Sequence, residues 1–247
     1  MESKRYEWPD NIRGFTLISM IFYHAVWDIV YLFDVEWTWF QSGLAYLWQQ
    51  SICWTFIFLS GFCWSFGRNK MRRGIIVFLA GMVVSLVTVI AMPGSLILFG
   101  VLTFLGTAML VMILLEPLCR KGKPLIGFAV SLLLFLLLRN INDGNLGFEA
   151  AEVMAVPKEL YANDVSTFLG FPKKGFFSTD YFSFFPWFFL FQAGYFGYRI
   201  AKEREWLRFL KGSQIPVLGT VGKHSLVVYL IHQPVVYGVL YVFFYFV

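Results

Sequence analysis

Apolar blocks of about twenty residues recur from one end of the chain to the other, and each is long enough to cross a bilayer core of about 30 Å as a helix. Only 14% of the residues are charged, whereas 58% are hydrophobic. We therefore predict an all-α polytopic membrane protein, a bundle of about seven transmembrane helices. The predicted spans are residues 13–33, 47–66, 74–91, 96–115, 124–138, 182–200 and 221–246.

The basic residues between these blocks predict the orientation of the bundle. Sixteen of the twenty Lys and Arg residues fall on the side of the N-terminus: Lys4, Arg5, Arg13, Arg68, Lys70, Arg72, Arg73, Arg120, Lys121, Lys123, Arg199, Lys202, Arg204, Arg208, Lys211 and Lys223. By the positive-inside rule the N-terminus is cytoplasmic and the C-terminus lies outside. The net charge of +5 is then a topology signal, and it does not call for nucleic acid.

Residues 1–8 are too polar for a signal peptide, and no small-residue cleavage site follows them, so we expect the first span to be retained. We treat residues 1–247 as a single transmembrane domain with an extracytoplasmic loop at about residues 139–181. That loop is longer than an ordinary connection. Within it we predict an amphipathic helical stretch at residues 148–156, and Asp180 and Tyr181 as substrate-binding candidates where the loop meets the sixth span.

The first span carries ionisable residues that are costly in lipid and therefore point to function. Arg13 and His24 are eleven residues apart, which is about three helical turns and about 16 Å of rise, so both share one helix face. Asp28 follows His24 by four residues, the spacing at which helical side chains meet. A general base is the favoured interpretation of His24, because imidazole titrates near neutral pH and Asp28 could fix its tautomer. A purely structural His–Asp pair is the alternative.

The last span contains the other two histidines, His224 and His232, at different depths of one predicted helix. His232 and Gln233 lie near the middle of the membrane, where we predict substrate binding or a polar network. A zinc site is less favoured, because the chain has no His-x3-His pair and no carboxylate cluster. The candidate residues of the first and last spans form one site only if the last span lies beside the first.

Several small residues and prolines predict how the helices pack. Ser60 and Gly61 allow another backbone to approach closely, and the small residues of 100–106 predict a second packing face. Residues 92–94, Met-Pro-Gly, predict a tight turn between two antiparallel spans. Pro186 predicts a kink in the sixth span.

Arg13 and Lys223, with His224 and Ser225 next to Lys223, would form a cationic mouth on the cytoplasmic side. Such a mouth suits a ligand that carries phosphate groups. A positive-inside anchor is the simpler interpretation of Arg13 alone, and the sequence does not separate the two.

The pattern Arg13-x10-His24 resembles the arginine–histidine motif of acyltransferase family 3. More of the chain resembles the heparan-α-glucosaminide N-acetyltransferase catalytic-domain family. The similar stretches are residues 10–14 (DNIRG), 20–24 (MIFYH), 99–106 (FGVLTFLG), 178–182 with 185–187, and 222–226 through 232–234 (HQP). At position 103 the chain has Thr where many relatives carry histidine.

The resemblance implies transfer of an acetyl or other acyl group from cytosolic acyl-CoA, with acetyl-CoA as the expected donor, to a sugar amine or hydroxyl on the far side of the membrane. The implied partners are acyl-CoA, a glycan or amino-sugar acceptor and membrane lipids, with a homodimer as one candidate assembly. No metal and no nucleic acid are expected. The implied location is the plasma membrane, as a multi-pass protein.

The sequence is compatible with two mechanisms. The acceptor could attack the thioester directly, or the acyl group could first be transferred to a histidine. Two other functions remain as alternatives. The first is a proton-coupled small-molecule transporter that uses the intramembrane His and Asp as a proton relay. The second is a non-catalytic assembly protein that presents its outer loop to a partner.

Overall fold

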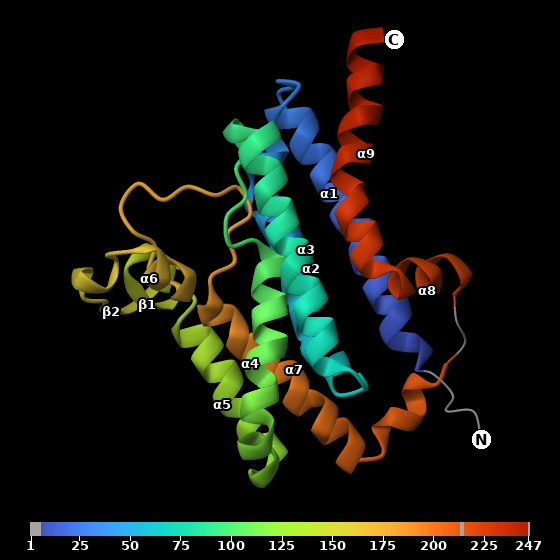
Figure 1. Ribbon diagram of the computed structural model, residues 1–247, viewed down its shortest axis with the longest axis vertical. Coiled ribbons are helices and arrows are strands. Elements are labelled where there is room, and N and C mark those ends of the chain that lie inside the picture. Colours follow the sequence, from blue (N-terminus) through green and yellow to red (C-terminus); the bar gives the residue numbers. More distant parts are fainter. Residues whose placement is uncertain (1–5, 213–214, 247) are drawn as a thin grey trace. The chain divides into compact units, whose positions relative to one another are not determined.

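The computed structural model describes residues 6–212 and 215–246, which form two compact units. The first unit contains the described residues up to Leu59 and those from Arg204 onward, and the second contains Ser60–Glu203 (Figure 1). Lys4 and Arg5, counted above on the cytoplasmic side, lie outside the described ranges. The single-domain organisation stays a prediction.

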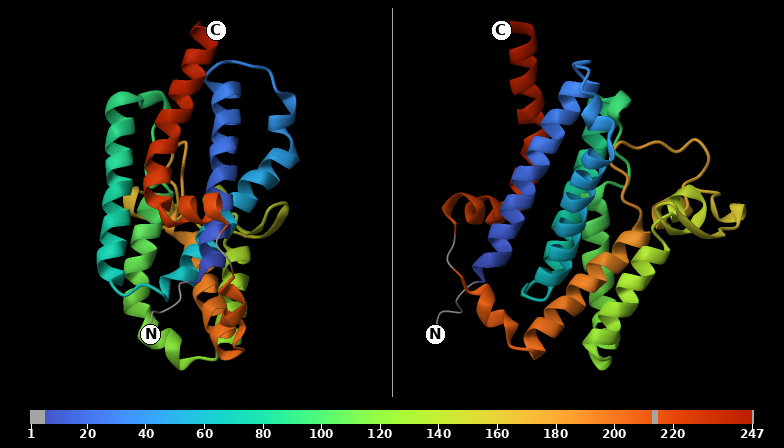
Figure 2. Two further views of the ribbon diagram at one scale, coloured as in Figure 1. Left: turned by 90° about the vertical axis from the view of Figure 1, so that its right-hand side faces the viewer. Right: turned by 180° about the vertical axis from the view of Figure 1, so that it is seen from behind.

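In the first unit, the long N-terminal helix lies against the C-terminal helices. Its elements are α1 (Glu7–Tyr31), η1 (Thr38–Gln41), most of α2 (Gly43–Trp64), η5 (Trp206–Leu210), α8 (Pro216–Lys223) and α9 (Ser225–Phe246). Both α8 and α9 pack on α1 (Figures 1 and 2). The prediction that the last span lies beside the first is therefore confirmed.

Two glycines allow α1 and α8 to touch backbone to backbone. A Cβ atom at Gly14 of α1 would lie 1.9 Å from the carbonyl oxygen of Leu218, and one at Gly222 of α8 would lie 1.9 Å from the carbonyl oxygen of Asp10. Asn11 strengthens the contact, because its buried side-chain oxygen accepts a hydrogen bond from the Ile215 N–H at 3.1 Å, where α8 begins. The position of α8 thus depends on residues near the start of α1.

The interface of α1 with α2 is apolar. Leu17, Met20 and Ile52 form a buried cluster, and Trp48 packs against it while its indole N–H donates to Ser19 at 2.8 Å. This cluster anchors the part of α1 that precedes His24.

The second unit begins with the last residues of α2 and contains α3 (Lys70–Ala91), η2 (Pro93–Ser95), α4 (Val101–Lys121), α5 (Pro124–Leu137) and α7 (Phe184–Glu203). A Cβ at Gly81 would lie 2.5 Å from the Thr103 nitrogen, and one at Gly106 would lie 2.4 Å from the Phe78 nitrogen. The predicted antiparallel hairpin of α3 and α4 and its small-residue packing face are confirmed.

Gly61 and Pro186 behave as the sequence predicts. A Cβ at Gly61 would lie 1.8 Å from the carbonyl oxygen of Phe191, so the end of α2 and α7 are in backbone contact. Phe185 has extended dihedral angles, φ −96° and ψ 139°, and the Phe185–Pro186 peptide bond is cis. The regular helix of α7 therefore starts after this break.

The prediction of a helix at residues 148–156 is wrong. The loop instead contains η3 (Ile141–Asp143), a hairpin of β1 (Asn145–Phe148) and β2 (Ala151–Ala155), η4 (Lys158–Leu160) and the short α6 (Asp164–Leu169). The strands pair antiparallel, with Phe148 opposite Ala151 and an irregularity at Gly147. Gly147 and Glu149 have φ of 143° and 50°, which a helix does not accommodate. A small β-hairpin is thus added to an otherwise helical fold.

Helices occupy each of the seven predicted spans. Among the described residues, α1, α3, α4 and α9 are long and apolar enough to cross a membrane, and α5 is a shorter apolar helix of 14 residues. These helices support a helical membrane protein, whereas the count of seven spans and the orientation of the termini stay predictions. The bounds of the last span are wrong, because α8 ends at Lys223 and α9 begins at Ser225.

Candidate functional site

A pair of histidines joins α1 to α9 in the first unit. The ring centroids of His24 and His232 are 5.0 Å apart with their planes inclined by 57°. The Tyr229 ring, one turn before His232 on α9, lies 5.3 Å from the His232 ring. Only 7% of His232 is exposed. Two imidazoles from opposite ends of the chain therefore meet, one half-buried and one buried.

The tautomer of His232 follows from its hydrogen bond. Its Nδ1 lies 2.5 Å from the carbonyl oxygen of Tyr229. Because a carbonyl oxygen can only accept, Nδ1 must carry the proton, and in the neutral ring Nε2 then presents a lone pair. This buried Nε2 has no hydrogen-bond partner within the described part of the chain. His232 is thus set to accept a proton or a hydrogen bond.

Asp28 and Gln233 make the second polar contact between α1 and α9. The Gln233 amide nitrogen donates to Asp28 Oδ1 at 2.7 Å, and Asp28 is completely buried. Asp28 lies one turn beyond His24 on α1, and Gln233 directly follows His232. The structure thus brings together four of the predicted site residues. The predicted role of Asp28 in orienting His24 stays a prediction, since the bond observed for its side chain is with Gln233.

Three buried acceptors in this cluster have no hydrogen-bond partner among the described residues: Asp28 Oδ2, Gln233 Oε1 and His232 Nε2. Gln233 Oε1 is an acceptor because the amide nitrogen of the same group is the donor to Asp28. Buried polar atoms without a partner cost free energy and call for an explanation. N–H or O–H donors from a ligand are one such explanation.

Arg13 lies two turns into α1, on the side that faces α8. Its guanidinium donates to Asp10 Oδ1 at 3.2 Å and reaches the carbonyl oxygen of Gly222 at 3.5 Å. The side chains of Arg13 and Asp10 are only 15% and 6% exposed. Arg13 therefore holds the end of α8, and Asp10 offsets its charge.

Lys223, His224 and Ser225 form the junction between α8 and α9, so the structure brings them next to the Gly222 carbonyl that Arg13 reaches. Lys223 and His224 are exposed, and His224 Nδ1 lies 3.0 Å from the Thr220 carbonyl oxygen. The expectation that His224 and His232 share one continuous helix is wrong. The helix breaks at His224 because the Gly222 contact directs α8 along α1.

Asp180 belongs to the second unit, where it supports the start of α4. Its Oδ2 accepts the Val101 N–H at 3.2 Å, and the neighbouring backbone pairs with residues before α4 through Thr179 to Leu96 and Phe182 to Phe99, both at 2.9 Å. A carboxylate at a helix N-terminus is stabilised by the unpaired N–H groups and the helix dipole. This contact alone explains an acid at position 180, and the substrate role stays a prediction.

We expect Asp180→Ala to lower the free energy of unfolding by about 1–2 kcal/mol, because α4 loses an acceptor at its first turn. The measurement is thermal unfolding in detergent. The control is Glu152→Ala, which removes an exposed carboxylate from strand β2 in the same unit and should cost less than about 1 kcal/mol. Equal effects of the two substitutions would contradict the capping role.

Tyr181 ties the loop to α6, since its hydroxyl donates to the Thr167 carbonyl oxygen. Burial raises the pKa of this hydroxyl above its ordinary value. Tyr181 thus stays protonated near neutral pH and serves as a donor. Its contact with substrate stays a prediction.

Sequence reasoning missed two residues that shape the site. Asn11 directs α8, and an amide side chain near the start of the first span was the available signal. The Tyr229 carbonyl fixes the His232 tautomer, for which the sequence holds no signal. The described residues contain no group of three His, Cys, Asp or Glu that could hold a metal ion.

The comparison with protein-family models gives a match to the family described as heparan-alpha-glucosaminide N-acetyltransferase, catalytic, over residues 5–234. The matched region includes α1, α8 and the His232–Gln233 part of α9. Searches of curated proteins and of solved structures gave no match.

The family match covers nearly the whole chain and agrees with the resemblance drawn from its motifs. The long apolar helices agree with a multi-pass membrane protein. The chain therefore belongs to the heparan-alpha-glucosaminide N-acetyltransferase catalytic-domain family and is a transmembrane acetyltransferase.

Proposed function

We propose that the protein moves an acetyl or other acyl group from cytosolic acyl-CoA to a sugar amine or hydroxyl on the extracytoplasmic side of the plasma membrane. The observation that carries this proposal is the contact of the half-buried His24 with the buried His232 inside a chain of this family. The family favours a transferase over the proton-coupled transporter. A homodimer stays a prediction.

In this proposal His24 is the general base. Its ring accepts the proton of the acceptor N–H or O–H while the nitrogen or oxygen attacks the thioester carbonyl carbon. The C–S bond then breaks, CoA leaves as a thiolate, and the proton on His24 returns to the sulfur. General-base assistance of this kind gives about 10²–10⁴-fold in rate.

His232 supports His24 in this scheme. Because the Tyr229 carbonyl keeps the proton on Nδ1, the buried Nε2 faces the cluster as an acceptor. An acceptor beside a general base fixes the tautomer of that base and stabilises its protonated form, as a carboxylate does in a catalytic triad. We assign His232 this positioning role, and its contact with the substrate stays a prediction, because the one lone pair of Nε2 serves one donor at a time.

The acceptor would be held by two buried atoms that lack a partner, Asp28 Oδ2 and Gln233 Oε1. Both accept hydrogen bonds, and sugar amines and hydroxyls supply donors. The donor would be held at the α8–α9 junction, where Lys223 and His224 are exposed and suit CoA phosphates. Ser225 and Arg13 would line the same CoA site. Asp180 and Tyr181 stay candidate contacts for the acceptor.

Acetyl-CoA binding tests the proposal without an acceptor. A ligand that binds the folded protein raises its melting temperature by mass action. We expect acetyl-CoA to stabilise the purified protein, and Lys223→Gln to shift the effect to higher acetyl-CoA concentration. No stabilisation at any concentration would favour the non-catalytic assembly protein. Trapping of acyl groups on His24 by mass spectrometry would replace direct transfer with an acyl-histidine intermediate.

The bond between Gln233 and Asp28 supports a separate prediction. Gln233→Leu should lower the free energy of unfolding by about 1.5–3 kcal/mol, because it leaves the buried Asp28 carboxylate without its donor. The double variant Asp28→Leu/Gln233→Leu should recover much of this loss while remaining inactive. Additive losses in the double variant would show that the two side chains do not interact.

A further inference from the structure

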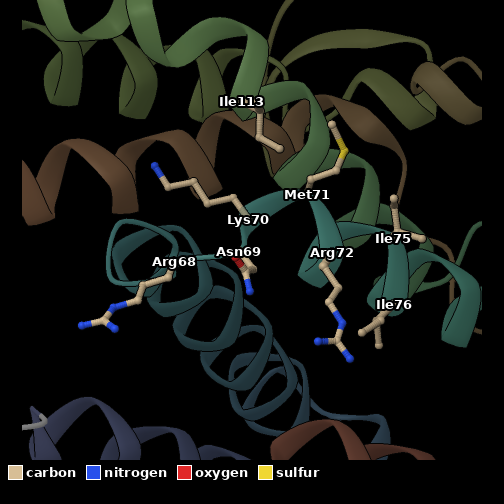
Figure 3. A pocket seen from close by; sticks show the side chains of 8 residues that line it. All are labelled: Arg68, Asn69, Lys70, Met71, Arg72, Ile75, Ile76 and Ile113. Carbon is tan, nitrogen blue, oxygen red and sulfur yellow. The ribbon is translucent and has the colours of Figure 1, made fainter.

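A pocket at the start of α3 combines arginines with apolar side chains. It has a volume of about 580 Å³ and is lined by Arg68, Asn69, Lys70, Met71, Arg72, Ile75, Ile76 and Ile113. All of these residues belong to the second unit. Figure 3 shows that its basic side chains come from residues 68–72 and its isoleucines from α3 and α4.

Lys70 already contacts two other side chains of the second unit. Its Nζ lies 2.9 Å from Glu116 Oε2 and 3.7 Å from the centroid of the Trp64 ring. In Figure 3 its side chain points away from that of Arg72. The charge of Lys70 is thus offset by Glu116.

Arg68 and Arg72 are exposed, and neither guanidinium has an ion pair or hydrogen bond within the described ranges. No Asp or Glu lines the pocket. Guanidinium groups present a fork of donors that matches phosphate geometry. The pocket therefore carries two uncompensated positive charges suited to a phosphate group.

The apolar side of the pocket continues along α3. Arg72, Ile76, Leu79, Val83 and Leu86 follow one another by four or three residues, so they share one face of the helix. The four apolar members are 44%, 55%, 57% and 59% exposed. A ligand bound at Arg72 would therefore find an open hydrocarbon surface directly below its charged group.

We propose that this pocket binds the phosphate of an anionic phospholipid, with an acyl chain lying along the apolar face of α3. A phosphate at the head of a long apolar stripe matches an amphiphile better than a free anion, which would leave the stripe unused. Basic pockets beside membrane helices recognise anionic lipid headgroups, and the predicted orientation places residues 68–73 on the cytoplasmic side, where such lipids are enriched. The residues of this lipid site belong to the second unit, whereas the His24–His232 contact belongs to the first.

The test compares the binding of two lipids, dioleoyl-phosphatidylglycerol and dioleoyl-phosphatidylcholine, to the full chain in a neutral detergent. Native mass spectrometry measures which lipid is retained, and the melting temperature measures which lipid stabilises the protein. We expect the anionic lipid to be retained and to stabilise the wild type. In Arg68→Gln/Arg72→Gln we expect about tenfold to thirtyfold weaker apparent affinity for it. Both substitutions are at exposed positions, so the melting temperature without lipid should match that of the wild type.

The matched control is Lys121→Gln/Lys123→Gln, which removes the same charge from exposed positions in the same unit, outside the pocket. It should bind the anionic lipid like the wild type. Equal weakening in both double variants, or equal binding of the two lipids by the wild type, would overturn the proposal. Stabilisation by inorganic phosphate or acetyl-CoA that depends equally on Arg68 and Arg72 would overturn it in favour of a free phosphate site.

Discussion

His24→Ala is expected to lower the turnover of acetyl transfer by about 10²–10⁴-fold, because the substitution removes the group that takes the proton from the attacking nitrogen or oxygen. His24→Gln should lose as much, since an amide keeps hydrogen bonds but cannot accept a proton at neutral pH. The measurement is the rate of acetyl transfer from labelled acetyl-CoA in proteoliposomes.

The fold should survive these substitutions, because Leu17, Met20 and Trp48 hold α1 independently of His24. The melting temperature of each variant is the control for folding. His224→Ala provides a contrast, since an exposed histidine at the proposed donor end should raise KM for acetyl-CoA and leave kcat near the wild-type value. Turnover of His24→Ala near that of the wild type would contradict the role of His24 as base.

Gly222→Ala and Gly14→Ala are expected to destabilise the protein by about 3 kcal/mol or more each, because the added methyl group meets a carbonyl oxygen of the opposite backbone. Unlike a flexible side chain, a helix backbone cannot rotate away, so α8 must move off α1. We also expect acetyl transfer to fall, since α8 leads directly into α9 and its His232. Thermal unfolding and activity of the purified variants measure both effects.

The matched control is Gly238→Ala in α9, where an added Cβ has no atom within 4 Å. This substitution should be neutral, or stabilising by up to about 1 kcal/mol through helix propensity. If Gly222→Ala and Gly238→Ala unfolded at the same temperature, the close contact of α1 with α8 would be refuted.

The helical bundle could be predicted because long apolar blocks leave few alternatives in a membrane. Local spacing also drew attention to a part of α1 that contacts α9, since His24 and Asp28 both lie in the polar contact with α9. The partner of each could not be predicted. A spacing of four residues suggests that His24 and Asp28 pair, but the observed donor to Asp28 is Gln233, more than two hundred residues away in the sequence.

Two errors share one physical cause, which is that periodicity ignores backbone conformation and tertiary contact. The pattern of residues 148–156 suits an amphipathic helix, yet the positive φ of Gly147 and Glu149 directs the chain into a hairpin. The predicted span 221–246 suits one helix, yet Gly222 holds α8 against Asp10 of α1 and α8 ends at Lys223. The sequence marks some glycines as close-approach positions, as at Gly61, but the backbone that each one meets is known only from the structure.

The most direct test of the proposed function is transfer across the membrane of sealed proteoliposomes, with labelled acetyl-CoA supplied on the side of the Lys223–His224 junction and an amino sugar on the other. We expect labelled acetylated sugar on the far side, formed by the wild type and lost in His24→Ala. Movement of substrate across the membrane without any acetylated product would contradict it, since that is the behaviour of a transporter.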